Sequence, residues 1–171
     1  MMISEYLTKD NINLGFKAEN WEAAIKKSGS ILEANDLIEP EYIDAMIEMV
    51  KDKGAYIVIT PGLALPHARP EKGAKKNGLS LLTLKEPVEF GHSKNDPVKV
   101  VISFCAADDS THTQMLSELA EFLKDKKNVN YIKEVGSKKE LLSYFENYDR
   151  GGESNEDLDS MRSRTGQQSY S

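Results

Sequence analysis

The order of helical and strand patterns along the chain constrains its fold more than any other feature. Apolar residues recur at helical spacing in two segments before residue 55 and in two more after residue 108. The apolar, β-branched runs that are typical of strands lie between them. This order predicts an α/β domain of two or three layers rather than a helical bundle or an all-β sandwich. At 171 residues, the chain has the length of one such domain.

The first two expected helices are defined by residues that start and end helices. One follows Asn20, a residue type that caps helix N-termini, and Gly29 can end it. Its inward face consists of Trp21, Ala24, Ile25 and Ser28. The other begins near Pro40, since proline is favoured in a first turn, and continues to Gly54. Its inward face consists of Ile43, Met46, Ile47 and Val50.

The strands are expected at residues 56–60, 79–84 and 98–106, with a short addition at 63–65. Two capped helices follow. Thr111 with Gln114, and Ser137 with Glu140, both have the spacing of a capping box. The apolar stripes behind these caps are Met115, Leu116, Leu119, Phe122 and Leu123 in one helix, and Leu141, Leu142 and Phe145 in the other.

Composition excludes several classes of function. The net charge is −6 and no lysine or arginine stripe stands out, so nucleic acid is a poor partner and a basic protein surface is a better one. The apolar runs are far shorter than the roughly 20 residues of a membrane helix. The N-terminus lacks a secretory signal, and the single cysteine, Cys105, cannot form an internal disulfide and is expected to be a buried small hydrophobe. We therefore expect a cytoplasmic protein.

The segment from Pro61 to Pro70 is rich in small residues and proline, a composition that restrains its backbone. It reads Pro-Gly-Leu-Ala-Leu-Pro-His-Ala-Arg-Pro and directly follows an expected strand. Prolines 66 and 70 restrict φ on either side of His67, and Gly62 permits a turn. We therefore expect the backbone, rather than side-chain packing, to hold the His67 imidazole in an exposed position. With an ordinary pKa of about 6.5, this imidazole is suited to be a neutral nucleophile.

The other two histidines differ in setting. His112 follows the expected cap Thr111 and shares the apolar face of its helix, so it should point inward. Burial and the helix dipole both oppose its protonation, and a neutral ring can donate one N–H to a phosphoryl group near the helix N-terminus. A core histidine bonded to a backbone carbonyl is the alternative. His92 lies in a turn-like segment between two strands and is expected to be a loop residue.

A zinc site built from the three histidines is the sharpest rival hypothesis, because zinc with an open coordination position can support hydrolysis. The spacings of His67, His92 and His112 match no zinc pattern, and no cysteine pairs occur. We expect no metal and no other cofactor.

Two motifs carry a resemblance to a known family. Residues 62–67, Gly-Leu-Ala-Leu-Pro-His, resemble the G-x-A-x-P-H motif of IIA domains of the fructose/mannitol class of the sugar phosphotransferase system. Residues 109–112, Asp-Ser-Thr-His, resemble that family's second active-site histidine, which opens a helix. Segments 61–70, 90–92 and 95–98 are most similar to the ascorbate-type branch, and the similarity covers roughly residues 3–147.

The resemblance implies a mannitol-type IIA fold, in which helices flank a mixed β-sheet. It implies a phosphotransferase component with a phosphohistidine intermediate, which accepts a phosphoryl group from the phosphocarrier HPr and passes it to a cysteine of a IIB component. A membrane IIC transporter is then an indirect partner. His67 matches the phosphorylated histidine and His112 the neighbouring one that stabilises the phosphoryl group. An alternative is a regulatory IIA-like module that controls a transcription or signalling partner.

One departure concerns charge at the site. Mannitol-type members carry an arginine in the helix before the active-site strand, and the alignment puts Met49 at that position. Another cation, Arg69 or Lys51, is then expected to contact the phosphate. Arg69 is the better candidate because it lies two residues from His67, although a solvated surface arginine is the alternative.

The domain is expected to cover residues 1–148 and to be followed by a polar tail at 149–171. The tail begins around Gly151-Gly152 and contains few sizeable apolar residues, so it is expected to be disordered. It is either a natural extension or an added expression sequence.

Overall fold

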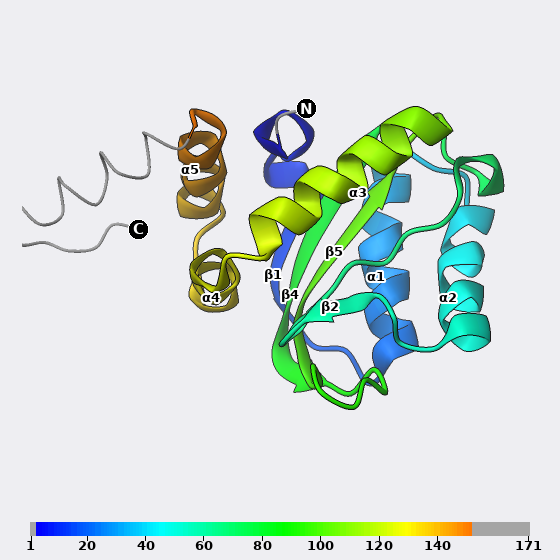
Figure 1. Ribbon diagram of the computed structural model, residues 1–171, viewed down its shortest axis with the longest axis horizontal. Coiled ribbons are helices and arrows are strands. Elements are labelled where there is room, and N and C mark those ends of the chain that lie inside the picture. Colours follow the sequence, from blue (N-terminus) through cyan, green and yellow to red (C-terminus); the bar gives the residue numbers. More distant parts are fainter. Residues whose placement is uncertain (1–2, 152–171) are drawn as a thin grey trace, which may run out of the picture.

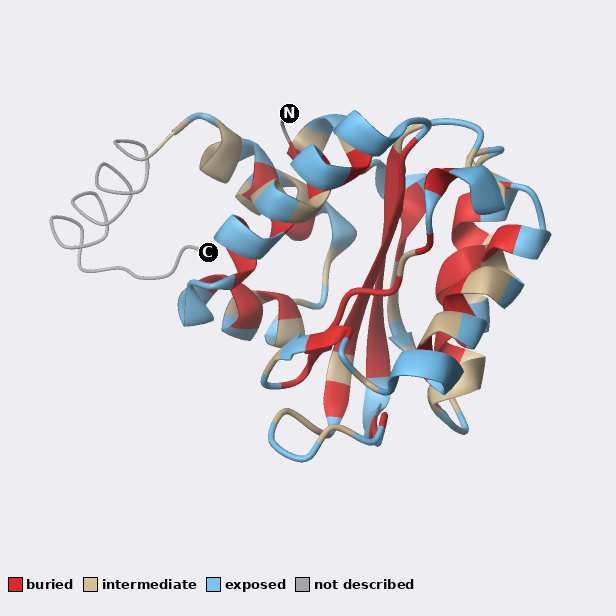
Figure 2. Cartoon of the chain, turned by 45° about the vertical axis from the view of Figure 1, so that its right-hand side comes forward, coloured by how far each residue is buried: buried red, intermediate tan, exposed pale blue. Residues whose placement is uncertain are grey.

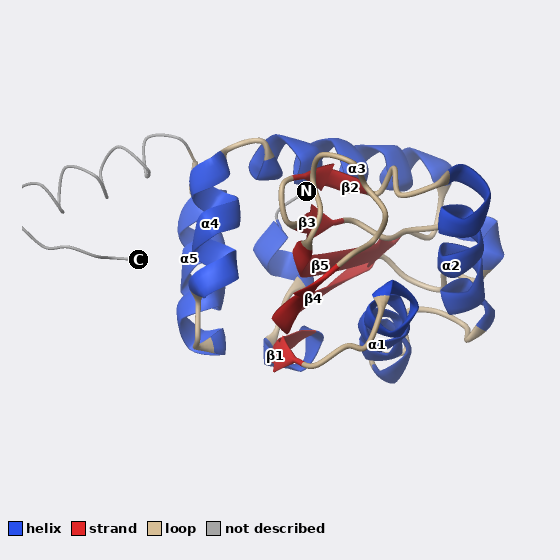
Figure 3. Ribbon diagram, turned by 90° about the horizontal axis from the view of Figure 1, so that it is seen from below, coloured by secondary structure: helices blue, strands red, loops and turns tan. Residues whose placement is uncertain are grey.

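The computed structural model describes residues 3–151. A five-stranded mixed sheet has the order β1-β4-β5-β3-β2 and lies between two groups of helices (Figures 1 and 3). The α/β domain with a mixed sheet flanked by helices, expected from the sequence, is therefore confirmed. The strands are β1 (Ile12–Phe16), β2 (Val58–Thr60), β3 (Leu63–Ala64), β4 (Gly78–Val88) and β5 (Val98–Cys105). The helices are α1 (Trp21–Ala34), α2 (Glu41–Lys53), α3 (Asp109–Leu123), α4 (Lys126–Glu134) and α5 (Lys138–Asp149).

The sheet combines two kinds of pairing. β4 and β5 form an antiparallel hairpin in the middle, β1 runs parallel to β4, and β3 runs parallel to β5. β2 is antiparallel to β3 at the edge. Three short 3₁₀ turns complete the order: η1 (Ile3–Tyr6), η2 (Lys9–Asn11) and η3 (Pro70–Lys72). This topology places β3 and the loop after it directly beside β5.

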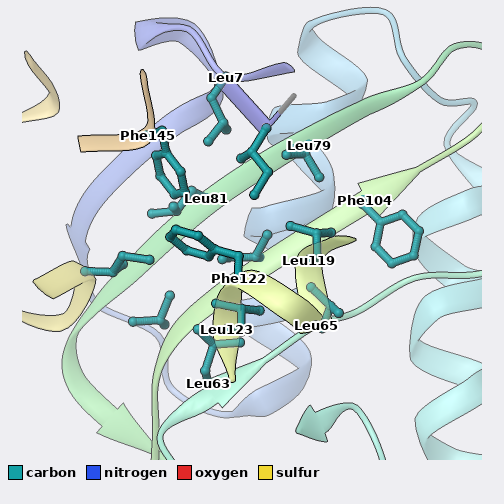
Figure 4. Packing of buried hydrophobic residues seen from close by; sticks show 14 of the residues in the cluster. Leu7, Leu63, Leu65, Leu79, Leu81, Phe104, Leu119, Phe122, Leu123 and Phe145 are labelled. Atoms are coloured by element: carbon teal, nitrogen blue, oxygen red, sulfur yellow. The ribbon is translucent and has the colours of Figure 1, made fainter. Parts of the chain in front are cut away.

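Both faces of the central strands are buried, as the red strands in Figure 2 show. Alternate residues of β5 point to opposite sides: Ile102 and Phe104 pack with α3, α4 and α5, whereas Val101 and Cys105 pack with α1 and α2. Figure 4 shows the first of these clusters, with Phe122 and Leu119 of α3 lying over Leu81 and Leu79 of β4. Two-sided burial explains why these strands read as nearly continuous apolar runs.

The first helix is longer than expected. Asn20 caps α1 by accepting a hydrogen bond from the Ala23 N–H at 2.8 Å, but Gly29 lies inside the helix and does not end it. A Cβ at Gly29 would lie 2.7 Å from the Ile43 side chain of α2. Glycine is needed there because α1 and α2 approach closely, so the predicted helix end was wrong. The second helix ends at Gly54 as expected, with φ of 85°.

The helix that carries His112 begins earlier than predicted. Asp108, not Thr111, is the N-cap of α3, and its carboxylate accepts a hydrogen bond from the Thr111 N–H at 2.8 Å. Several capping residue types stand in a row here, and the helix starts at the first of them. The second predicted cap is confirmed, because Ser137 accepts from the Glu140 N–H at 3.2 Å at the start of α5.

Two elements were missed by sequence reasoning. β1 is five residues long and contains Gly15, which has φ of 78° and weakens the strand pattern. α4 is strongly charged and buries only Asn128, Val129 and Ile132. The central strands were found, although β2 is shorter than predicted and β4 longer.

The two ends of the described chain are joined. The Asp149 carboxylate at the end of α5 accepts hydrogen bonds from the backbone N–H groups of Ile3 (3.3 Å) and Ser4 (2.6 Å). The predicted tail covers residues 149–171, and its part from residue 152 onward lies outside the described residues. Within residues 3–151, no helix is long and apolar enough to cross a membrane.

Candidate active site around His67

The loop that carries His67 is tied to the sheet by its backbone. The Leu65 N–H donates to the Ile57 carbonyl at 2.8 Å, and the Phe104 N–H of β5 donates to the Pro66 carbonyl at 3.2 Å. At the start of the loop, Gly62 has φ of 83°, a conformation that favours glycine, and its N–H donates to the Asn95 carbonyl at 2.9 Å. The expectation that the backbone holds this segment is therefore confirmed.

Among residues 3–151, one nitrogen of the His67 ring has a hydrogen-bond partner and the other has none. Its Nδ1 lies 2.7 Å from the Leu65 carbonyl oxygen. Because a carbonyl oxygen only accepts, the proton of the neutral ring resides on Nδ1 and the lone pair resides on Nε2. The ring stacks on Phe104 with centroids 5.0 Å apart and meets the edge of Tyr56 at 6.1 Å.

His67 is half-buried, not exposed as expected, because these aromatic rings pack around it. The expectation that the backbone rather than packing holds the ring was therefore wrong in part, since both do. Burial lowers the pKa of its imidazole, and the charge of His112 lowers it further, while the hydrogen bond to the Leu65 carbonyl acts in the opposite direction. The ring is therefore neutral at pH 7, so its Nε2 is available as a nucleophile.

His112 faces the same site from α3. Its ring centroid lies 5.5 Å from that of His67, and the residue is 8% exposed, so the prediction of an inward orientation is confirmed. Burial, followed by the charge of Arg69, lowers the pKa of His112. Its Nδ1 is buried without a hydrogen-bond partner among residues 3–151. A cationic ring would leave a charged N–H unpaired there, so the neutral form is favoured.

An open cavity of about 330 Å³ adjoins the two histidines. Arg69 contributes a cation from the loop, and Met49 and Lys53 come from α2. The remaining lining residues are Tyr56, Ala68, His67 and His112. The cavity therefore combines two neutral imidazoles with two flexible cations, a set of groups suited to an anionic ligand.

His92 does not take part in this site. It lies in the turn between β4 and β5, whereas His67 contacts Phe104 near the other end of β5. Among residues 3–151, no group of three or more histidine, cysteine or acidic side chains is arranged to hold a metal ion. The structure therefore brings His67 and His112 together but does not bring His92 to them.

A family comparison agrees with a site built around His67 and His112. The family model of the phosphoenolpyruvate-dependent sugar phosphotransferase system, EIIA 2, matches residues 5–148. The chain belongs to this family. It is a phosphotransferase system EIIA component, and the family predicted from the two histidine motifs is confirmed.

Relatives and solved structures agree with this assignment. The ascorbate-specific EIIA component of Escherichia coli strain K12 is 39% identical over 137 residues, which cover 80% of this chain and 89% of the relative. The solution structure of the mannitol-specific cryptic enzyme IIA CmtB from Escherichia coli has a TM-score of 0.77 at 32% identity and covers 88% of this chain and all of its own. A third match is a chain in the Escherichia coli complex of enzyme IIA and phosphorylated enzyme IIB for mannitol. Its TM-score is 0.72 at 29% identity, and the match covers 81% of this chain and 96% of that chain.

The cations of this EIIA site differ in part from those expected. Met49 lines the cavity, as the alignment placed it, and Arg69 does so as well. Lys51 does not line it: its Nζ pairs with the Glu22 carboxylate at 3.3 Å. Lys53 was missed, although it lies one helical turn after Met49 and a search for cations at that spacing would have found it. The ring of Tyr56 was missed because no local pattern predicts its contact with His67.

Cys105 has no part in the EIIA site. It is fully buried on the opposite face of β5, and burial raises the pKa of its thiol to about 12. The prediction that it is a buried small hydrophobe is confirmed.

Proposed function

We propose that this EIIA component accepts a phosphoryl group from phosphorylated HPr on Nε2 of His67. It then passes the group to a cysteine of a IIB component, which serves a membrane IIC transporter for ascorbate or a similar sugar. The reaction takes place in the cytoplasm, and the domain over residues 1–148 carries it without a metal or cofactor.

One observation carries the proposal: the 2.7 Å contact between His67 Nδ1 and the Leu65 carbonyl. It selects the ring tautomer whose lone pair is on Nε2. The same contact has a second effect during transfer. As Nε2 forms a bond to phosphorus, positive charge develops on the ring and Nδ1–H becomes a stronger donor, so the Leu65 oxygen stabilises the product.

The transfer needs no external acid or base at His67. In the first step the Nε2–P bond forms while the P–N bond to the donor histidine breaks, and its electron pair returns to the donor ring. In the second step a IIB thiolate attacks phosphorus, the S–P bond forms, and the electron pair of the Nε2–P bond returns to His67. The protein must mainly align donor and acceptor and surround the transferring oxygens with positive groups.

His112, as a neutral hydrogen-bond donor, and Arg69, as a cation, surround the transferring oxygens. His112 donates an N–H to the phosphoryl oxygens from a ring 5.5 Å away from His67. Arg69 lines the same cavity and is exposed, so it can reach an arriving phosphoryl group without losing an existing ion pair among the described residues. Lys53 adds a cation from α2, the helix in which the uncharged Met49 occupies the position of the family's arginine.

The choice of sugar and of partner rests on the relatives. Similarity to the ascorbate-specific EIIA component supports an ascorbate-like substrate for the transporter, and similarity to an EIIA chain bound to phosphorylated IIB supports a IIB acceptor.

Incubation of the chain with phosphoenolpyruvate, its kinase and HPr, followed by addition of the cognate IIB, tests this function. We expect one phosphoryl group on His67, located by mass spectrometry under alkaline conditions, and its loss when IIB is added. A chain that is phosphorylated but retains its phosphoryl group with IIB, and that co-purifies with a transcription factor, would be a regulator instead.

A further inference from the structure

Tyr42 is buried beneath the His67 loop and makes no contact with the cavity in which chemistry is proposed. It lies in the first turn of α2 and is 0% exposed. Its hydroxyl accepts a hydrogen bond from the Ala68 N–H at 3.0 Å. The hydroxyl proton faces two acceptors, the carbonyl oxygens of Ala68 at 2.9 Å and Phe104 at 3.0 Å. One side chain thus satisfies both backbone groups of the residue that follows His67.

The other bonds of the loop show what the Tyr42 hydroxyl adds. Leu65 and Pro66 are held by backbone bonds to Ile57 and Phe104, and His67 is held through Nδ1. All of these restrain the N-terminal side of His67. On its C-terminal side, Ala68 is 1% exposed and its N–H and carbonyl both bond to Tyr42. Without the hydroxyl, two buried backbone groups would lose their partner.

Phe104 links this arrangement to the imidazole. Its ring stacks on His67, its N–H donates to Pro66, and its carbonyl oxygen faces Tyr42. Tyr42 therefore joins α2, β5 and the loop at the point where His67 is presented. Burial raises the pKa of the phenol well above its ordinary value, so the hydroxyl keeps its proton at any working pH.

We infer that Tyr42 is a positioning residue: its hydroxyl fixes the Ala68 peptide and so keeps His67 in the orientation in which Nδ1 meets the Leu65 carbonyl and Nε2 faces the cavity. Phosphoryl transfer is sensitive to this orientation because in-line attack tolerates little misplacement of the nucleophile. This inference rests on the proposed phosphorylation of His67.

Tyr42→Phe removes only the hydroxyl and keeps the ring in the core. Tyr144→Phe is the matched control: the Tyr144 hydroxyl donates to Asn128 Oδ1 at 2.5 Å, in the α4 and α5 region away from His67. We expect Tyr42→Phe to lower kcat for phosphoryl acceptance about tenfold with KM for phospho-HPr unchanged, whereas Tyr144→Phe transfers at the wild-type rate.

A second readout is the tautomer of His67, which nitrogen NMR measures directly. The wild-type ring should carry its proton on Nδ1 alone, and Tyr42→Phe should show a mixture of both tautomers. A Tyr42→Phe protein with wild-type kcat, a single unchanged tautomer, or a loss equalled by Tyr144→Phe would overturn the inference. If Tyr42→Phe does not fold, amide exchange in the wild type decides: the Ala68 N–H should exchange slowly, and exchange at the rate of an open loop would overturn the inference.

The same experiments separate this inference from the function on which it rests. If the wild-type chain takes no phosphoryl group on His67, the proposed function fails. If it does and Tyr42→Phe matches it, only the role of Tyr42 fails.

Discussion

Two loops of this protein each hold a histidine by its Nδ1 atom, and they hold it in opposite senses. In the 61–70 loop, His67 Nδ1 donates to the Leu65 carbonyl. In the 90–97 loop, His92 Nδ1 accepts from the backbone N–H groups of Lys94 (3.1 Å) and Asn95 (2.9 Å). The first arrangement leaves a lone pair on Nε2, whereas the second uses the Nδ1 lone pair and leaves the proton of the neutral ring on Nε2.

The surroundings of the two rings reinforce this difference. His67 lies between Phe104, Tyr56 and His112 beside a cavity with cations. The 90–97 loop is instead organised by the Asp96 carboxylate, which accepts from the N–H groups of the three residues at 90–92. The kind of backbone group that Nδ1 meets therefore decides the role of each ring. A carbonyl at Nδ1 leaves the Nε2 lone pair of His67 available as a nucleophile, whereas N–H groups at Nδ1 make His92 part of a turn.

The largest difference is expected between glutamine variants of the two histidines, His67 and His92. His67→Gln should abolish phosphoryl acceptance because it removes Nε2, the atom proposed to form the bond to phosphorus. His92→Gln should keep acceptance within about twofold of wild type and cost about 1 kcal/mol of folding stability, since one exposed and one part-buried amide lose their acceptor. Transfer of labelled phosphate from phospho-HPr, with melting curves for both variants, measures this. Equal loss in the two variants would break the comparison.

A smaller loss is expected when His112 is replaced. His112→Ala should still allow phosphorylation of His67 but should slow onward transfer to IIB about a hundredfold, corresponding to about 3 kcal/mol for one preorganised donor. Rapid-mixing measurements of transfer to IIB test this. Because His112 is nearly buried, the variant must first be shown to keep its melting temperature. Wild-type transfer by a well-folded variant would make His112 a bystander and leave Arg69 and the helix amides as the phosphate-binding groups.

The cations should matter less than the histidines. Arg69→Gln should slow transfer about tenfold, since an exposed charge near the phosphoryl group is screened by water. Lys51→Gln is the matched control, because Lys51 pairs with Glu22 and does not line the cavity. Rates should also fall as salt increases in the wild type and less so in Arg69→Gln. Equal rates for Arg69→Gln and Lys51→Gln would show that Arg69 is a solvated surface residue.

The smallest effect concerns pH. The pKa of His67 is lowered mainly by burial, so in the folded protein the ring binds its proton at a pH below about 6.5, the ordinary value. Between the folded pKa of His67 and its unfolded value of about 6.5, the unfolded chain binds more protons than the folded protein. The contribution of neutral His67 to folding stability is therefore present above about pH 6.5 and is lost as pH falls through the folded pKa. Proton NMR should give a His67 midpoint below 6.5. A midpoint above 6.5 would contradict the account. His112→Ala should raise the midpoint slightly, because it removes a ring that opposes protonation of His67 when it becomes charged at low pH.

The sequence predicted the fold best where the pattern is repeated over many residues. The strands β4 and β5 and the stripes of α2 and α3 were found because each contributes several apolar residues to a core. Their antiparallel pairing was not predicted. α4 was missed because its burial depends on its neighbours, and Gly29 was misread because close packing of α1 on α2, not a helix end, requires it. Caps were ambiguous where Asp108 and Thr111 both fit.

The candidate site follows the same division. His67, His112 and Arg69 stand in or next to local motifs and were named from the letters alone. Lys53, Tyr56 and Tyr42 reach the site only through the packing of α2 and the following segment against the loop. The tautomer of His67 also depends on a three-dimensional contact with Leu65, which residue order alone does not reveal.

The most direct test of the central claim is to identify the phosphorylated nitrogen. The chain, labelled with ¹⁵N in its histidines, is phosphorylated by HPr and phosphoenolpyruvate, and its phosphorus–nitrogen coupling is measured by NMR. The account predicts a single phosphoryl group on Nε2 of His67, with the proton on Nδ1 still bonded to the Leu65 carbonyl. A phosphoryl group on Nδ1 of His67, or on His112 or His92, would contradict it.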